Sequence, residues 1–148
     1  MALKVALWIS LLTAMSAFSS AHARLGAMGI GVSDLDKSQA FYEEVLGLET
    51  KRVYELGYLN EIVMGYVGDE GAVVVLMNWP GQDRVYDGND VKLVFYVNDA
   101  AGALEKMRNR GSKIDREATP IDALPGVLVG LARDPDNYVV EVIERIHK

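Results

Sequence analysis

The 148-residue chain contains no cysteine, and its only histidines are His22 and His147. Without cysteine, the chain cannot form disulfides, thiol nucleophiles, iron–sulfur clusters or Cys-type zinc sites. With so little histidine, a Ser-His-Asp triad or a metal site built from several histidines is unavailable. Ordinary hydrophobic packing must therefore stabilise the fold, and carboxylates, amines and hydroxyls must supply any polar chemistry.

Positive charge is scarce as well. The chain has 15 Lys and Arg side chains against 21 Asp and Glu, which gives a formal net charge of −6. A negative charge of this size disfavours nucleic acid and anionic membrane surfaces as partners. We therefore expect a small molecule as the main partner.

The first 23 residues have the pattern of a signal peptide. Lys4 supplies a positive start, residues 5–18 are mostly apolar, and Ala21-His22-Ala23 is a small-x-small cleavage pattern. The apolar run is short for a membrane span, although an uncleaved N-terminal anchor is the alternative. We expect residues 24–148 to form a single domain, periplasmic or secreted, with no stable membrane association after cleavage.

The order of predicted elements occurs twice. In the first half, a strand over 28–32 precedes a helix over 36–46, capped by Ser33 or Asp34, and strands near 49–56, 61–67 and 72–78. In the second half, a strand over 91–97 precedes a helix capped by Asn98 or Asp99, and strands near 113–118, 127–133 and 138–144. The pattern predicts an α+β domain of two duplicated βαβββ modules, at about 25–79 and 90–145.

Strand alternation predicts which side chains face away from the helices. In the fifth strand, Leu93 and Phe95 alternate with Lys92 and Tyr96, so the two sets face opposite sides. The first set should pack on a helix, and the second should face a concave pocket. Glycines in the first strand would leave room for a ligand there, or else mark a bulge. The expected pocket residues are Ala27, Gly29, Val73, Val75, Met77, Lys92, Tyr96 and Glu141.

Glu141 lies between Val140 and Val142 in the last strand, where a carboxylate is uncommon. Either it faces water on the solvent side of the strand, or it points into a cavity and does chemistry there. Arg52 and Trp79 are weaker candidates for ligand contacts. Arg52 could instead be solvated surface, and Trp79 could belong to the core or to a dimer contact.

Three segments resemble one known family. They are 31–38 (GVSDLDKS), 41–48 (FYEEVLGL) and 134–141 (DPDNYVVE). Together they are similar to the glyoxalase, bleomycin-resistance and extradiol dioxygenase group, the vicinal oxygen chelate superfamily. The resemblance covers nearly the whole mature chain. It implies two βαβββ modules that form a curved mixed sheet around a concave pocket.

The resemblance also implies where a metal would bind. In glyoxalase I four side chains hold a divalent ion, and the matching positions here are Ala27, Val75, Lys92 and Glu141. Only Glu141 is an ordinary ligand, and one carboxylate does not hold a catalytic divalent ion. We therefore expect no metal and no cofactor, and we expect Lys92 to take the place of the metal beside Glu141. That pair either neutralises a vestigial site or acts on a ligand.

Two functions follow from this pattern. The first is an exported, metal-independent binding protein for a small molecule, like the antibiotic-binding members of the superfamily. The alternative is a metal-free lyase, isomerase or epimerase of the lactoylglutathione lyase type, with Glu141 as acid and base and Lys92 as the residue that holds an anionic or carbonyl-bearing ligand. In both cases we expect a homodimer.

Overall fold

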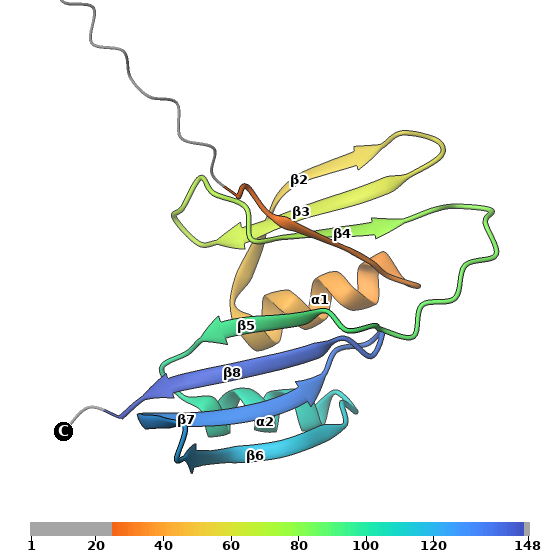
Figure 1. The fold of residues 1–148 in the computed structure, drawn as a ribbon. Coiled ribbons are helices and arrows are strands. Elements are labelled where there is room, and N and C mark those ends of the chain that lie inside the picture. The colour runs from red at the N-terminus through yellow and green to blue at the C-terminus, as the bar shows by residue number, and fades with distance from the viewer. Residues whose placement is uncertain (1–24, 147–148) are drawn as a thin grey trace, which may run out of the picture.

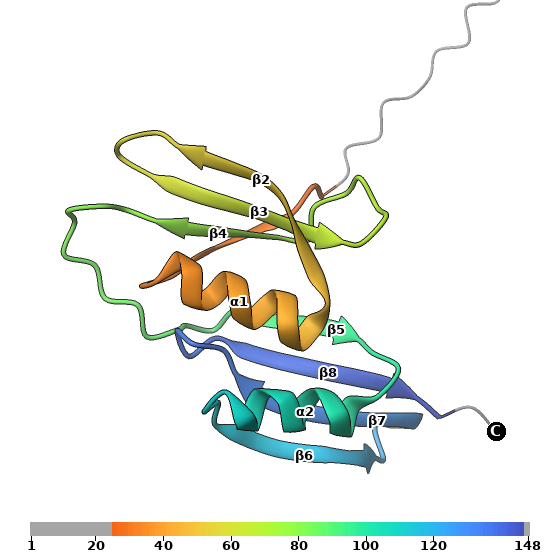
Figure 2. The same cartoon turned by 180° about the vertical axis from the view of Figure 1, so that it is seen from behind.

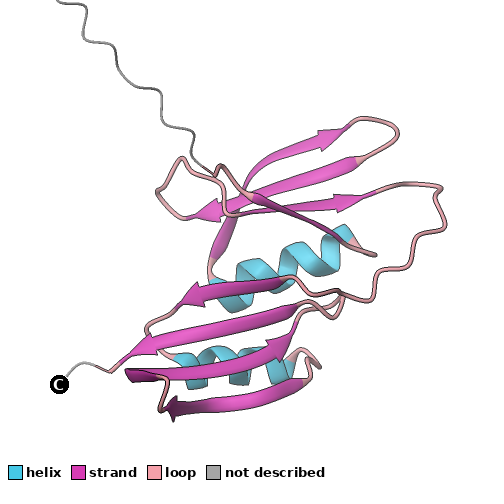
Figure 3. Cartoon of the chain, viewed as in Figure 1, coloured by secondary structure: helices cyan, strands magenta, loops and turns pink. Residues whose placement is uncertain are grey.

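A computed structural model describes residues 25–146 as two four-stranded sheets with one helix each (Figures 1 and 3). The first sheet has the order β1-β4-β3-β2 and the second has the order β5-β8-β7-β6. In each sheet the first pair, β1 with β4 or β5 with β8, is parallel and the others are antiparallel. This is the predicted duplicated α+β fold. The predicted signal peptide, residues 1–23, lies outside the described residues.

The element bounds follow the sequence pattern closely in both halves. The first half contains β1 (Met28–Gly31), α1 (Leu35–Leu46), β2 (Leu48–Glu55), β3 (Asn60–Tyr66) and β4 (Val74–Asn78). The second half contains β5 (Lys92–Tyr96), α2 (Ala100–Asn109), β6 (Ile114–Ile121), β7 (Leu124–Arg133) and β8 (Val139–Arg145). Neither helix within residues 25–146 is long and apolar enough to cross a membrane.

Local capping explains where the helices begin. Asp34 and not Ser33 caps α1, because its carboxylate accepts a hydrogen bond from the Lys37 amide at 3.0 Å. Asp99 and not Asn98 caps α2, by accepting a hydrogen bond from the Gly102 amide at 2.8 Å. At the other end of α1, Gly47 adopts the left-handed conformation with φ of 68°, which most side chains disfavour.

The hairpin of β6 and β7 is longer than the sequence pattern predicted. β6 continues to Ile121 and β7 starts at Leu124, whereas the prediction ended and restarted these strands at 118 and 127. Pro120 is tolerated because β6 is the edge strand of its sheet, where a missing amide hydrogen need not break a ladder. The pairing of β6 with β7 is irregular, with register shifts on both sides of Thr119.

Both helices lie on the same side of the two sheets (Figures 1 and 2). α1 contacts its own sheet and α2, so buried residues from the two halves form a single core. At their junction the rings of Tyr42 on α1 and Phe95 on β5 lie 6.3 Å apart between centroids. Among residues 25–146, no helix covers the opposite faces of the sheets. We call these the open faces.

A turn between β7 and β8 ties the halves together through two buried carboxylates. Asp136 is 3 % exposed and accepts hydrogen bonds from the Ser33 amide at 2.9 Å and the Ser38 hydroxyl at 3.2 Å. Asp134 is 5 % exposed and accepts a hydrogen bond from the Tyr42 hydroxyl at 2.8 Å. Both aspartates lie between β7 and β8. They also bind the start of α1, about 100 residues earlier in the chain.

Asp134 also closes the turn, since its second oxygen accepts hydrogen bonds from the amides of Asp136 and Tyr138. Burial raises the pKa of this carboxyl to about 6, although the hydrogen bonds from Tyr42, Tyr138 and Asp136 act to lower it. Burial of the Tyr42 hydroxyl, together with the nearby Asp134 charge, raises the pKa of that hydroxyl. The contact between the two halves therefore includes the Asp134 carboxylate, whose negative charge is costly to bury.

Replacement of Asp134 by Asn should alter how stability depends on pH. Because the pKa in the folded protein is about 6, above the ordinary value of 3.8, the folded state binds this proton more readily than the unfolded state. Stability from this group is present at acid pH and is lost as pH rises through 6. Relative to the parent, Asp134→Asn should therefore gain about 1 kcal/mol of unfolding free energy between pH 5 and pH 7. Urea unfolding at the two pH values measures this difference.

The comparison with the parent cancels the opposite contribution of carboxyls with lowered pKa, such as Asp115 beside Lys113 and Arg133. A difference between variant and parent that does not change with pH would contradict the assigned titration. A change of the opposite sign would contradict it as well.

Candidate functional site

The second sheet places the predicted polar residues on its open face. In β5 the side chains of Leu93 and Phe95 are buried under the helices, while Lys92, Val94 and Tyr96 are exposed on the other side. β8 runs parallel to β5 and pairs Val94 with Glu141. Because directly paired residues share a face, Glu141 lies on the open face with the β5 polar residues.

Lys92 and Glu141 form an ion pair, with 2.5 Å between Lys92 Nζ and Glu141 Oε2. The Glu141 side chain is only 12 % exposed, whereas that of Lys92 is 49 % exposed. Glu141 is flanked by its register partners Val94 on β5 and Leu131 on β7, which are both apolar. The carboxylate is thus mostly shielded from solvent, and the ammonium covers it from the open side.

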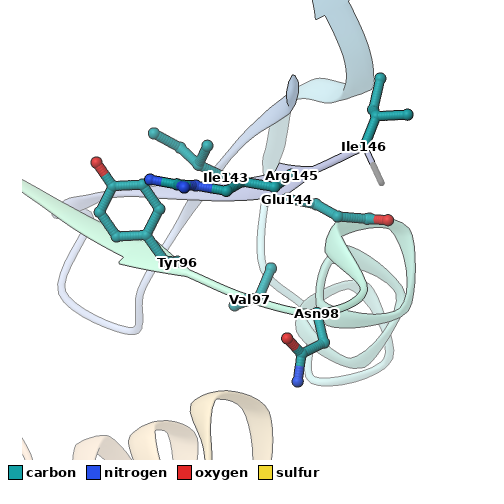
Figure 4. A pocket seen from close by; sticks show the side chains of 7 residues that line it. All are labelled: Tyr96, Val97, Asn98, Ile143, Glu144, Arg145 and Ile146. Atoms are coloured by element: carbon teal, nitrogen blue, oxygen red, sulfur yellow. The ribbon is translucent and has the colours of Figure 1, made fainter. Parts of the chain in front are cut away.

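A hollow of about 740 Å³ lies further along the same two strands, at their carboxyl ends (Figure 4). Tyr96 and Ile143 are register partners on the open face, and Arg145 is two residues further along β8 on the same face. Tyr96 is 70 % exposed, and Figure 4 shows the Arg145 side chain extending toward its ring. Among residues 25–146, no carboxylate forms an ion pair with Arg145. The hollow therefore offers a guanidinium and a phenol hydroxyl, together with the Glu144 carboxylate, which accepts a hydrogen bond from the Ala100 amide.

The other predicted pocket residues lie on the first sheet. Gly29 pairs with Val75 between the parallel strands β1 and β4, and Gly31 pairs with Met77. Among the described residues no strand pairing connects this sheet to the one that carries Lys92 and Glu141. By alternation the first sheet's open face carries Ala27, Gly29, Val73, Val75 and Met77.

Side chains of the chain itself fill the space beside the β1 glycines. A Cβ at Gly29 would lie 2.9 Å from Met77 Cε, so the thioether covers this position. A Cβ at Gly31 would meet the rings of Tyr86 and Trp79 at 3.2 and 3.3 Å. The glycines thus permit close packing by Met77 and by two aromatic rings, where the sequence pattern suggested room for a ligand.

The two weaker candidates have different surroundings. Trp79 packs near Gly31, and the Arg84 guanidinium stacks on its ring at 3.8 Å from the centroid, so Trp79 is part of an internal cluster. Arg52 is exposed on β2 and pairs with Val63 in β3. The Tyr54 hydroxyl nearby raises the pKa of the Arg52 guanidinium.

Sequence reasoning did not single out Arg145 or Leu131. Arg145 could have been found, because it lies four residues after Glu141 and alternation places both on one face. Leu131 could not, because its position beside Glu141 depends on the register of β7 against β8.

The positions that resemblance assigns to metal ligands do not suit a divalent ion. Ala27 and Val75 carry no side-chain donor atom, and Lys92 is a cation whose ammonium occupies one Glu141 oxygen. Within residues 25–146, no three side chains of the types His, Cys, Asp and Glu are grouped so that they could hold a metal.

The fold is that of proteins built from two βαβββ modules. Residues 24–142 match the family model described as "Glyoxalase/Bleomycin resistance protein/Dioxygenase superfamily", and the chain belongs to this superfamily. The resemblance stated from the sequence motifs is thereby confirmed.

Relatives of this chain include lactoylglutathione lyases. A probable lactoylglutathione lyase from Synechocystis sp. is 35 % identical over 124 residues, which cover 80 % of this chain and 93 % of that protein. The lactoylglutathione lyase of Escherichia coli O157:H7 is 32 % identical over 121 residues, covering 76 % and 86 %.

Solved structures agree with the fold. Glyoxalase I from Zea mays superposes with a TM-score of 0.72 and 26 % identity over 84 % of this chain, which spans only 46 % of the maize chain. The trypanothione-dependent glyoxalase I of Leishmania major gives a TM-score of 0.68 at 25 % identity, covering 83 % of this chain and 87 % of that one.

Proposed function

We propose that this chain is a lyase or isomerase that moves a proton next to a carbonyl group without a bound metal, with Glu141 as the acid and base. The observation that carries the proposal is the Lys92–Glu141 ion pair, which brings a cation and a shielded carboxylate together on an apolar strip. The similarity to lactoylglutathione lyases supports lyase or isomerase chemistry over simple binding.

Glu141 and Lys92 have different roles in the proposed proton transfer. The Glu141 carboxylate accepts a proton from the carbon next to the carbonyl, while the electron pair of that C–H bond moves toward the carbonyl oxygen. Lys92 has three N–H donors and needs one for Glu141, so another can donate to the oxygen on which negative charge develops. Glu141 then returns the proton to the former carbonyl carbon, while a hydroxyl on the first carbon passes its proton to the former carbonyl oxygen and becomes the new carbonyl. The product is an isomer of the substrate, and no oxidant is needed.

The position of Arg145 indicates that the substrate is anionic. It lies about 13 Å along β8 from Glu141, at the rise expected for four residues of a strand. A carboxylate at the far end of an extended substrate could bind the guanidinium while the carbonyl end reaches Lys92. Lactoylglutathione, named in the relatives, contains a carbonyl and free carboxylates, so it is the first substrate to test.

Glu141→Gln should abolish proton transfer and retain the fold. With lactoylglutathione in D₂O, the parent should incorporate deuterium at the lactoyl carbon that bears the hydroxyl, because Glu141 exchanges its proton with solvent. The variant should exchange at least about 100-fold more slowly, the usual contribution of a positioned acid–base group. Proton NMR of the lactoyl signal measures the exchange.

Glu105→Gln is the matched control, since Glu105 is an exposed carboxylate on α2 whose partner is Arg108. Exchange that is equally fast in Glu141→Gln and the parent would exclude Glu141 as the proton carrier.

The second candidate is a metal-independent binding protein, favoured by the apolar character of the strip around Glu141. Val94, Leu131 and Ile143 provide contact area, and such sites bind small molecules by burial with a few polar contacts. A ligand that raises the melting temperature equally in the parent and Glu141→Gln, with no turnover by either, would favour binding over catalysis.

We also propose that a second copy of the chain covers the open faces. Val94 and Tyr96 are 44 % and 70 % exposed on the second sheet, and Tyr54 is 38 % exposed on the first. Clustered exposed apolar side chains on a helix-free face suit a self-association surface. A second copy could then bring a first-sheet open face over the Lys92–Glu141 pair.

Tyr96→Asp should shift the protein from dimer to monomer, because a carboxylate would be buried without a partner in the interface. Light scattering after size-exclusion chromatography measures the mass. Tyr58→Asp is the control, since Tyr58 is 65 % exposed in the loop between β2 and β3, away from the open faces. A parent protein that is monomeric at all concentrations tested would contradict the proposal.

A further inference from the structure

A second hollow, of about 430 Å³, lies on the helix side of the molecule where the two halves meet. Its walls come from α1, the connection between α2 and β6 (residues 110–113), the end of β7 and the β7–β8 turn. The buried ring of Phe41 forms part of its wall. It is distinct from the Lys92–Glu141 site, which lies on the open face.

Four cationic side chains from three segments line this hollow: Lys37, Arg110, Lys113 and Arg133. Such a concentration is unexpected in a chain whose net charge is −6. Like charges that converge repel one another, and a bound anion relieves that repulsion.

Carboxylates compensate this charge only in part. Arg110 pairs with Glu44, while Lys113 and Arg133 share Asp115 at 2.7 and 2.5 Å. Lys37 has no carboxylate partner among residues 25–146. Glu44 and Asp115 do not line the hollow, so these two carboxylates lie outside it.

One carboxyl does line the hollow, and three hydrogen bonds already bind it. Asp134 accepts hydrogen bonds from the Tyr42 hydroxyl and from the amides of Asp136 and Tyr138. By contrast, Arg133 uses Nε for Asp115 and Nη1 for the Asn137 carbonyl, so Nη2 has no partner among the described residues. Lys37 and Arg133 thus retain donors for a ligand from opposite halves of the chain.

We propose that this hollow binds the phosphate group of a small phosphorylated molecule. Phosphate carries close to two negative charges and presents several acceptor oxygens, which matches a mixture of lysine and arginine donors better than a single carboxylate does. Because Lys37 belongs to the first half and the other three cations to the second, the bound group bridges the halves beside the Asp134 tie. Binding therefore stabilises the folded chain.

The test is thermal unfolding with inorganic phosphate and, separately, with glucose 6-phosphate, each against sodium chloride at the same ionic strength. With an affinity of about 1 mM, 10 mM ligand should raise the melting temperature by about 5 °C. The double variant Lys37→Gln/Lys113→Gln should lose most of this rise. Lys106→Gln, an exposed lysine on α2 outside the hollow, should retain it.

A stronger effect of glucose 6-phosphate than of inorganic phosphate supports a phosphorylated metabolite as the ligand. The reverse order overturns that choice in favour of free phosphate. The site itself is contradicted if neither compound shifts the melting temperature beyond chloride, or if the double variant responds as the parent does. Circular dichroism of the double variant without ligand confirms that a lost response is not lost folding.

Discussion

The turn at Asp134 and Asp136 determines how the two halves of this chain are arranged. Each carboxylate is buried, and each binds donors on or just before α1, so the second half is held against the first by charged hydrogen bonds. Such bonds are stronger than neutral ones, and an unpaired buried carboxylate would be costly. α1 is consequently held against the second half as well as against its own sheet.

The candidate site depends on this arrangement. β8 begins at Val139, immediately after the turn, and carries Glu141 on the side that faces away from the helices. Because the helices occupy one side of both sheets, the opposite side remains open around the Lys92–Glu141 pair (Figures 1 and 2). One eight-residue motif, 134–141, thus provides both the tie that holds the core together and the carboxylate on the open face.

Local patterns in the sequence predicted much of this architecture. The duplicated order of elements and the common face of Lys92 and Glu141 follow from local hydrophobic patterns and strand alternation. Capping preferences narrowed each helix start to two adjacent residues, Ser33 or Asp34 and Asn98 or Asp99. These features depend on neighbours a few residues away. The resemblance of three sequence motifs to a known superfamily also predicted the family, which the match over residues 24–142 confirms.

Features that depend on distant contacts could not be predicted in this way. The contact of Asp136 with Ser38 joins residues 98 positions apart, and the thioether of Met77 over Gly29 depends on the register of β1 against β4. The glycines suggested room for a ligand because alternation shows which face a residue occupies, but not which side chain covers it. Register and packing between elements are set by the whole core.

The central claim is that the Lys92 ammonium replaces a metal beside Glu141 in proton transfer. Its most direct test is elemental analysis of the purified, active protein, with turnover of lactoylglutathione measured before and after treatment with a chelator. The account predicts a metal content far below one ion per chain and a rate that chelation leaves unchanged. One tightly bound divalent ion per chain, with activity that falls on its removal and returns on its addition, would contradict it.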